Sequence, residues 1–108
     1  MGVISRGSLL TLRSTAADIA TITTTKYDDN CWHGTLEARE EFEQFRPLFA
    51  AQLAAMAAED WHEAGRVYHE IRAALSLRRP DGSIVPEFLL HIDGSAASFR
   101  WSDEPFSE

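Results

Sequence analysis

The chain has 108 residues, of which 44% are hydrophobic and 25% charged, a composition typical of one soluble globular domain. Its formal net charge is -7, from 17 acidic and 10 basic side chains. This charge argues against nucleic acid or an anionic membrane as the main partner, because phosphate binding requires a basic surface. We expect residues 1–108 to form a single domain with an acidic tail at 102–108 that frays.

Cysteine use and hydropathy bear on where the protein resides. Cys31 is the one cysteine, which excludes an intramolecular disulfide and favours a reducing compartment. No apolar run approaches the roughly 20 residues needed to cross a bilayer. The first residues also lack the basic, apolar and cleavage segments of a signal peptide. We therefore expect a cytoplasmic protein with no membrane partner.

The first third of the chain is predicted to form strands. Segments 8–14 (SLLTLRS) and 18–27 (DIATITTTKY) are rich in threonine and aliphatic residues, which suit a half-exposed sheet surface. The Asp-Asp-Asn sequence at 28–30 predicts a turn, and a third short strand follows over 31–36 (CWHGTL).

The middle of the chain is predicted to be helical. Five apolar residues recur at spacings of three and four and fall within an arc of roughly 80° on a helical wheel: Phe42, Phe45, Phe49, Leu53 and Met56. This phase continues across Pro47. We therefore expect either one kinked helix or two nearly coaxial helices with Pro47 in the first turn of the second.

A further helix is predicted to begin at Asp60. Asp60 with Glu63 three residues later resembles a capping box, in which side chain and backbone satisfy the first free N–H groups of a helix. The helix is expected to run to about Leu75 or Leu77 and must stop before Pro80, because proline cannot continue it.

This helix contains an aromatic-His-Glu triplet repeated after seven residues, at 61–63 and 68–70. On a helical wheel Trp61 and Tyr68 fall on the apolar side and are predicted to be core, whereas His62 and His69 point outward. Seven residues separate the two histidines by about 10.5 Å along the axis, too far for one zinc ion with bonds of roughly 2 Å. We interpret the repeat as a solvent-exposed face on which Arg66 pairs with the two glutamates, and predict no metal and no cofactor.

The last third is predicted to return to strands. Segment 83–92 (SIVPEFLLHI) places Phe88, Leu90 and Ile92 on one face, and Asp93-Gly94 is a two-residue hairpin signal before the returning strand SAASFRW. Strands, two helices and strands together predict an α+β fold. We expect an antiparallel sheet of N-terminal strands plus a C-terminal β-hairpin, with the pair of central helices packed on one face.

Three residues are weak catalytic candidates: Cys31, His33 and His91. Cys31 and His33 alternate onto one face of a presumed strand, about 6.5–7 Å apart, a pairing that suits a thiolate nucleophile or half of a metal site. Nothing in the sequence identifies a third group to orient the base. His91 lies opposite the apolar face of its strand.

An alanine-rich face and an acidic segment form the predicted partner-binding surface. On the side away from the apolar stripe lie Ala50, Ala54, Ala57 and Ala58, and before them come Glu37, Glu40, Glu41 and Glu43. Small side chains permit close approach of another element or of a second copy of the chain, although alanine is also simply the best helix former. The glutamates form an acidic patch that a basic partner would recognise.

These observations favour a small acidic cytoplasmic protein-interaction module, acting as an immunity-type inhibitor, adaptor or accessory factor, over an enzyme. The competing hypothesis is a small enzyme or ligand-binding protein with a pocket between the helix pair and the sheet, using Cys31, His33 and His91. It requires at least two of these side chains to lie within hydrogen-bond reach in a cleft. A homodimer built on the alanine face is a third alternative.

Overall fold

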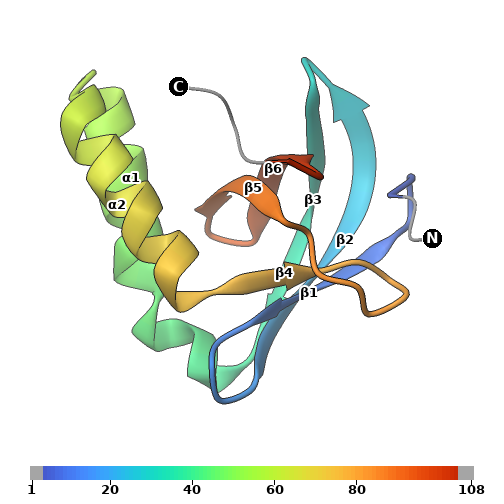
Figure 1. Cartoon of the computed structure of the whole chain (residues 1–108). Coiled ribbons are helices and arrows are strands. Elements are labelled where there is room, and N and C mark those ends of the chain that lie inside the picture. The colour runs from blue at the N-terminus through green and yellow to red at the C-terminus, as the bar shows by residue number, and fades with distance from the viewer. Residues whose placement is uncertain (1–3, 105–108) are drawn as a thin grey trace.

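The computed structural model describes residues 4–104 and has an α+β fold, as the sequence predicts (Figure 1). Six antiparallel strands form one curled sheet in the order β4-β1-β2-β3-β6-β5, so β4 and β5 are its edges. Two helices lie side by side along one flank of the sheet. The elements are β1 (Leu9–Arg13), β2 (Asp18–Asp28), β3 (Cys31–Ala38), the 3-10 helix η1 (Glu40–Gln44), α1 (Arg46–Ala57), α2 (Trp61–Ala74), β4 (Ser76–Arg78), β5 (Glu87–Asp93) and β6 (Ala96–Ser102).

The predicted turn at 28–30 joins the long hairpin of β2 and β3. Asp28 pairs with Cys31, and the two loop residues Asp29 and Asn30 have positive φ angles of 53° and 62°. Aspartate and asparagine tolerate this left-handed conformation better than other side chains, and it matches the twist of a two-residue hairpin. The local chemistry of the turn therefore sets the register of the two central strands.

Gly34 allows β2 and β3 to approach closely where the register of β2 shifts, between Thr24 and Lys26. A Cβ atom at Gly34 would lie 2.4 Å from the backbone oxygen of Thr23 and 3.2 Å from the Cγ2 atom of Ile22. On the bulged strand, the Thr25 hydroxyl donates to the His33 carbonyl oxygen over 3.1 Å. Only a residue without a side chain fits at this crossing point.

The first helical region is two elements, the 3-10 helix η1 and α1, and Pro47 lies in the first turn of α1, as one of the two predicted arrangements places it. The predicted apolar stripe is wrong in part, because the phase does not continue across the break. Phe42 and Phe49 are fully buried and stack at 5.7 Å, but Phe45, Leu53 and Met56 are only partly buried. On α1 the buried positions are Phe49, Gln52 and Ala55.

The connection between α1 and α2 is capped on both sides. The N–H of Glu59 donates to the carbonyl of Met56, and the N–H of Asp60 donates to that of Ala55. These two bonds form a Schellman motif, and Glu59 occupies the left-handed position at φ 56° that glycine usually takes. As predicted, Asp60 caps α2, because its Oδ1 accepts the Glu63 N–H over 3.1 Å.

The second helix ends earlier than predicted, at Ala74. Residues 76–78 form a short strand, β4, which pairs with β1 and places Leu77 opposite Leu12. Leu75 and Leu77 are both buried, a spacing of two that belongs to a strand. In the C-terminal hairpin the loop residues are Gly94 and Ser95, one position later than predicted, because Asp93 remains paired with Ala96.

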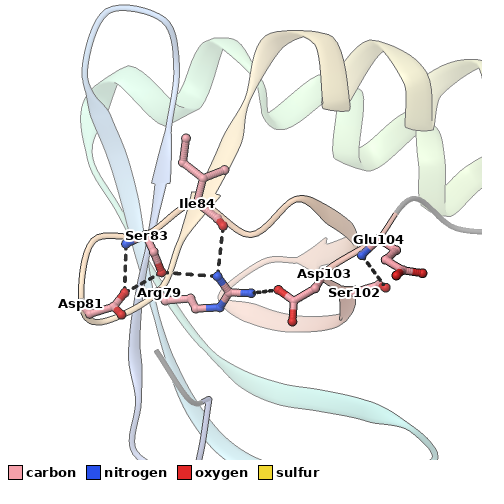
Figure 2. A network of polar contacts seen from close by, with 7 residues as sticks. All are labelled: Arg79, Asp81, Ser83, Ile84, Ser102, Asp103 and Glu104. Carbon is pink, nitrogen blue, oxygen red and sulfur yellow. Dashed lines mark hydrogen bonds and ion pairs between the residues drawn. The ribbon is translucent and has the colours of Figure 1, made fainter. Parts of the chain in front are cut away.

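The loop after β4 is fastened to the end of β6 by Arg79 (Figure 2). Its guanidinium donates to the carbonyl oxygen of Ile84 at 3.1 Å and to the carboxylate of Asp103 at 2.5 Å, and stacks 4.9 Å from the ring of Trp101. The Arg79 side chain is only 9% exposed. Residues 105–108 of the predicted tail lie outside the described residues, whereas Ser102 still belongs to β6.

One core joins the helices to the sheet. The fully buried side chains come from nearly every element, and include Leu10, Leu12, Ile19, Ile22, Phe42, Phe49, Ile71, Leu77, Phe88, Leu90 and Phe99. The predicted apolar face of Phe88, Leu90 and Ile92 is confirmed. Because successive side chains of a strand point to opposite faces, Leu89 and His91 of β5 point away from this core.

Candidate functional site

A mostly apolar cavity lies between the helix pair and the edge strand β5, and its volume is about 280 Å³. We call it the α1–α2–β5 cavity. It is lined by Gln52 and Met56 of α1, by Trp61, Ala64, Gly65 and Tyr68 of α2, and by Leu89 and His91 of β5. The small residues Ala64 and Gly65 leave the space open, and, apart from the chain neighbours of Gly65 and the backbone of its own helix, no atom lies within 4 Å of the position that a Cβ atom of Gly65 would occupy.

Gln52 belongs to the lining, but its unpaired amide oxygen is shielded from the cavity. Its residue is 2% exposed, and its amide oxygen Oε1 is buried without a hydrogen-bond partner in the described part of the chain. Most buried polar atoms in proteins are paired, because an unpaired one costs about 1–3 kcal/mol. Sequence reasoning missed Gln52, since a glutamine within an alanine-rich helix is usually exposed.

His91 is the sequence-predicted candidate that lines this cavity. Its imidazole is partly buried rather than solvated, and burial lowers its pKa because desolvation disfavours the charged form. At neutral pH the ring is therefore neutral and presents one nitrogen as a donor and the other as an acceptor. The cavity thus contains two uncharged polar side chains, Gln52 and His91, among apolar ones.

The prediction that the aromatic residues of the repeated triplet belong to the core is wrong for Trp61. Its side chain is 63% exposed while lining the cavity. The apolar side of α2 is buried only further along the helix, at Val67 and Ile71, so the first turn projects beyond the core. Tryptophan is among the residues that are enriched in protein interfaces.

Tyr68 is held at the cavity wall by a polar network on its far side. Its hydroxyl donates to the carboxylate of Glu87, which also accepts from Nε of Arg72 at 2.9 Å. Burial, followed by the hydrogen bond to Glu87, raises the pKa of Tyr68 to about 12. Burial acts to raise the pKa of Glu87, but its hydrogen bonds with Tyr68 and Arg72 outweigh that effect and lower it. Tyr68 is therefore a fixed wall of the cavity.

The outer part of α2 is arranged as predicted. Arg66 forms ion pairs with both Glu63 and Glu70, and the hydrogen bond from Arg66 is the first cause that lowers the pKa of Glu63. His62 and His69 are exposed. The repeat of His and Glu is a solvated, salt-bridged helix face.

A second cavity, of about 240 Å³, also has His91 in its lining. It is lined by His33, Leu53, His91, Asp93, Ala96, Ala97 and Ser98. The strand register places Ser98 opposite both His33 and His91, so the three side chains share one face of the sheet. Two of the three catalytic candidates therefore line one cavity, with Ser98 between them.

These residues are not connected as a catalytic group. Within residues 4–104 neither the imidazole of His33 nor that of His91 forms a hydrogen bond with the Ser98 hydroxyl or with the other imidazole. Because adjacent strands lie about 4.8 Å apart, the backbones of the two histidines are roughly 10 Å apart. Cys31 lies at the start of β3 opposite Asp28 and lines neither cavity.

The acidic residues of the predicted partner surface are exposed, but they lie outside the cavities. They are Glu37 at the end of β3, and Glu40, Glu41 and Glu43 in η1. Glu43 pairs with Arg46 at 2.9 Å, and that hydrogen bond lowers the pKa of Glu43. The carboxylates remain accessible to solvent.

The predicted alanine face is also exposed: Ala50, Ala54, Ala57 and Ala58. The buried alanine of α1 is instead Ala55, at 6% exposure. In the part of the chain that the structure describes, the four exposed alanines serve no packing role.

Residues 4–104 contain no group of three or more His, Cys, Asp or Glu side chains placed to hold a metal ion. No helix in the same range is long and apolar enough to cross a membrane.

Comparison of the chain with protein-family models, with curated proteins and with solved structures finds no match.

Proposed function

We propose that this protein is a protein-interaction module, an immunity-type inhibitor, adaptor or accessory factor, that binds its partner at the α1–α2–β5 cavity. The observation that carries the proposal is Trp61, whose indole is 63% exposed at an apolar cavity. Tryptophan is among the residues that contribute most binding energy at protein interfaces, where a few aromatic anchors and the pockets that they fill dominate.

The cavity and the charge of the chain support a protein partner. The volume of the cavity is about 280 Å³. It has room for one large side chain inserted from another protein. The net charge of -7 supports a partner with a basic surface, because complementary charge speeds encounter and excludes wrong partners.

Capture from cells of the source organism with matched variants tests this function. Gly65→Phe fills the cavity from a position with open space around it, and Trp61→Ala removes the exposed indole. Ala54→Arg adds comparable bulk on an exposed position of α1 outside the cavity lining, and a triple variant replaces Glu40, Glu41 and Glu43 by lysine. Thermal unfolding first establishes that each variant is folded.

We expect the unmodified protein to capture a stoichiometric protein partner. Both cavity variants should lose this partner, and the Ala54→Arg and triple-lysine variants should retain it. The complex is then reconstituted from purified components with the same variants. Failure of the unmodified protein to retain any stoichiometric protein would overturn the function. The cavity would not be the binding site if both cavity variants still captured the partner while Ala54→Arg or the triple-lysine variant lost it.

A further inference from the structure

We infer that a cavity formed by β1, β4 and the end of α2 binds a small phosphate monoester. We call it the β1–β4 cavity, and its volume is about 450 Å³. The phosphate group lies between Arg13 and Arg78, and the organic group of the ester covers Ile84. The inference goes beyond the proposed function, because the β1–β4 cavity shares no lining residue with the α1–α2–β5 cavity.

The lining of the β1–β4 cavity is basic, although the chain as a whole has 17 acidic and 10 basic side chains. It contains Arg13, Arg72 and Arg78 but no aspartate or glutamate. Two of these arginines pair with carboxylates outside the lining, Arg13 with Asp18 at 2.8 Å and Arg72 with Glu87 at 2.9 Å. In the described part of the chain Arg78 forms no ion pair. This unbalanced charge in a concave site favours an anion as the ligand.

The register of β1 and β4 places two arginines on one face of the sheet. Arg13 pairs with Ser76, and Arg78 follows two residues later on β4. The intervening residues Leu12 and Leu77 are fully buried, so the side chains of Arg13, Ser76 and Arg78 point away from the core. Diagonal neighbours on adjacent antiparallel strands lie about 7–8 Å apart. Two long guanidinium side chains at this separation can bind the same anion.

The accessible donors of the lining match the oxygens of a phosphate. Nη1 of Arg78 donates to the carbonyl of Gly82 at 3.2 Å, which leaves Nη2 as its accessible donor, because Nε is buried. Both Nη atoms of Arg13 and the hydroxyls of Thr15 and Ser76 also have no hydrogen-bond partner among the described residues. A carboxylate offers two acceptor oxygens, whereas a phosphate monoester offers three and carries close to two negative charges. Phosphate therefore uses more of these donors.

Ile84 provides an apolar surface beside the basic groups. It is 53% exposed and lines the β1–β4 cavity, whereas the neighbouring lining residues Leu75 and Val85 are buried. Inorganic phosphate would leave Ile84 in contact with water, but the organic group of an ester would cover it, and burial of apolar surface is favourable. The ligand is therefore a phosphate ester rather than the free ion.

NMR titration of the ¹⁵N-labelled full chain tests this site, using the amides of Thr15, Ser76 and Arg78. The probes are phenyl phosphate, inorganic phosphate, benzoate and N-acetylphosphoserinamide, which represents a phosphorylated side chain of a protein. The titrations are run at low ionic strength, because salt screens exposed charges. We expect a dissociation constant on the order of 1 mM for phenyl phosphate, and values about 10-fold higher for the other three probes.

Matched variants locate the binding. Arg78→Gln should weaken binding of phenyl phosphate by about 10-fold, the effect of one charged hydrogen bond, and Arg13→Gln provides a second, independent variant. Arg66→Gln removes an exposed, ion-paired arginine of α2 outside the cavity and should change the affinity by less than about twofold. In Ile84→Ser, phenyl phosphate should bind no more tightly than inorganic phosphate. Thermal unfolding first establishes that each variant is folded.

Several results would contradict the inference. Absence of shifts at about 10 mM phenyl phosphate would exclude the site. Equal weakening by Arg78→Gln and Arg66→Gln would mean that the anion responds only to the overall charge of the chain. Benzoate binding as tightly as phenyl phosphate would exclude selection of phosphate, and tighter binding of N-acetylphosphoserinamide would identify a phosphorylated protein segment as the ligand. All of these outcomes are independent of the capture of a protein partner at the α1–α2–β5 cavity.

Discussion

Replacing Gly34 by alanine is expected to destabilise the protein strongly, although alanine differs by a single methyl group. The new Cβ atom would lie 2.4 Å from the backbone oxygen of Thr23 and 3.0 Å from its carbonyl carbon. Observed Cβ contacts essentially never fall below 3.0 Å, so β2 would have to withdraw by about 0.6 Å. That movement would strain the ladder at the centre of the sheet.

The size of the effect follows from the atoms involved. Overpacking a well-filled core costs about 1–3 kcal/mol, and the upper half of that range applies because a backbone atom cannot rotate away. Alanine also restricts the unfolded chain more than glycine does, which stabilises the folded state by about 0.5 kcal/mol. We expect a net loss of about 2–3 kcal/mol, a large part of the roughly 5–15 kcal/mol that stabilises a domain of this size. The melting temperature would fall by about 10 °C or more.

The same substitution at Gly65 provides the control and is expected to act in the opposite direction. No atom outside its chain neighbours and the backbone of its own helix lies within 4 Å of its Cβ position, and alanine in a helix interior is favoured over glycine by about 0.5–1 kcal/mol. Urea unfolding followed by circular dichroism measures both variants. If Gly34→Ala unfolded within 0.5 kcal/mol of the unmodified protein, the close approach of β2 and β3 would not limit the residue at that position.

Five further substitutions test other parts of the structure by the same unfolding assay. Asp60→Ala removes the cap of α2 and should cost about 1 kcal/mol; no loss would mean that the cap does not stabilise the helix. Glu59→Gly relieves a left-handed residue and should gain about 1 kcal/mol, so a loss would contradict the Schellman geometry. Arg79→Ala should lower the free energy of unfolding by about 2–3 kcal/mol, because this guanidinium is nearly buried. Asp103→Ala should lower it far less, because that carboxylate is exposed. Equal losses in the two variants would mean that the stabilisation comes from the ion pair. Because the folded pKa of His91 lies below its unfolded value of about 6.5, stability should fall as the pH drops below about 6.5, where only the unfolded chain gains that proton. His91→Gln should flatten this decline between pH 7.5 and 5.5, and an unchanged slope would exclude His91 as its source.

Elements with a local chemical signal could be predicted from the sequence. The turn at Asp29 and Asn30 follows from side chains that tolerate positive φ, and the start of α2 follows from the Asp60 cap. The strand β4 could not be predicted in this way, because three residues are held as a strand only by pairing with β1, more than sixty positions earlier in the chain. Non-local pairing of this kind overrides the helical pattern of the preceding segment.

The competing hypothesis placed a pocket between the helix pair and the sheet, and of its three residues, Cys31, His33 and His91, only His91 lines the α1–α2–β5 cavity. Its other features depend on what covers each side chain. A helical wheel gives the direction of Trp61 correctly but cannot show that the core ends before the first turn of α2. The phase of α1 was misjudged because the helix restarts after Phe45, which turned Gln52 rather than Leu53 into the buried residue.

The segment that follows β4 also protects the sheet from adding foreign strands. An open edge presents unpaired N–H and carbonyl groups to any other extended chain, which is a route to aggregation. At β4 the carbonyl of Leu77 accepts a hydrogen bond from the N–H of Val85, and the backbone of Arg78 forms an isolated β-bridge with Ile84. At the opposite edge of the sheet, α1 runs beside β5. Because Arg79 fastens the covering segment, its loss should let β4 recruit another molecule. The Arg79→Ala protein is therefore expected to form aggregates well below its melting temperature.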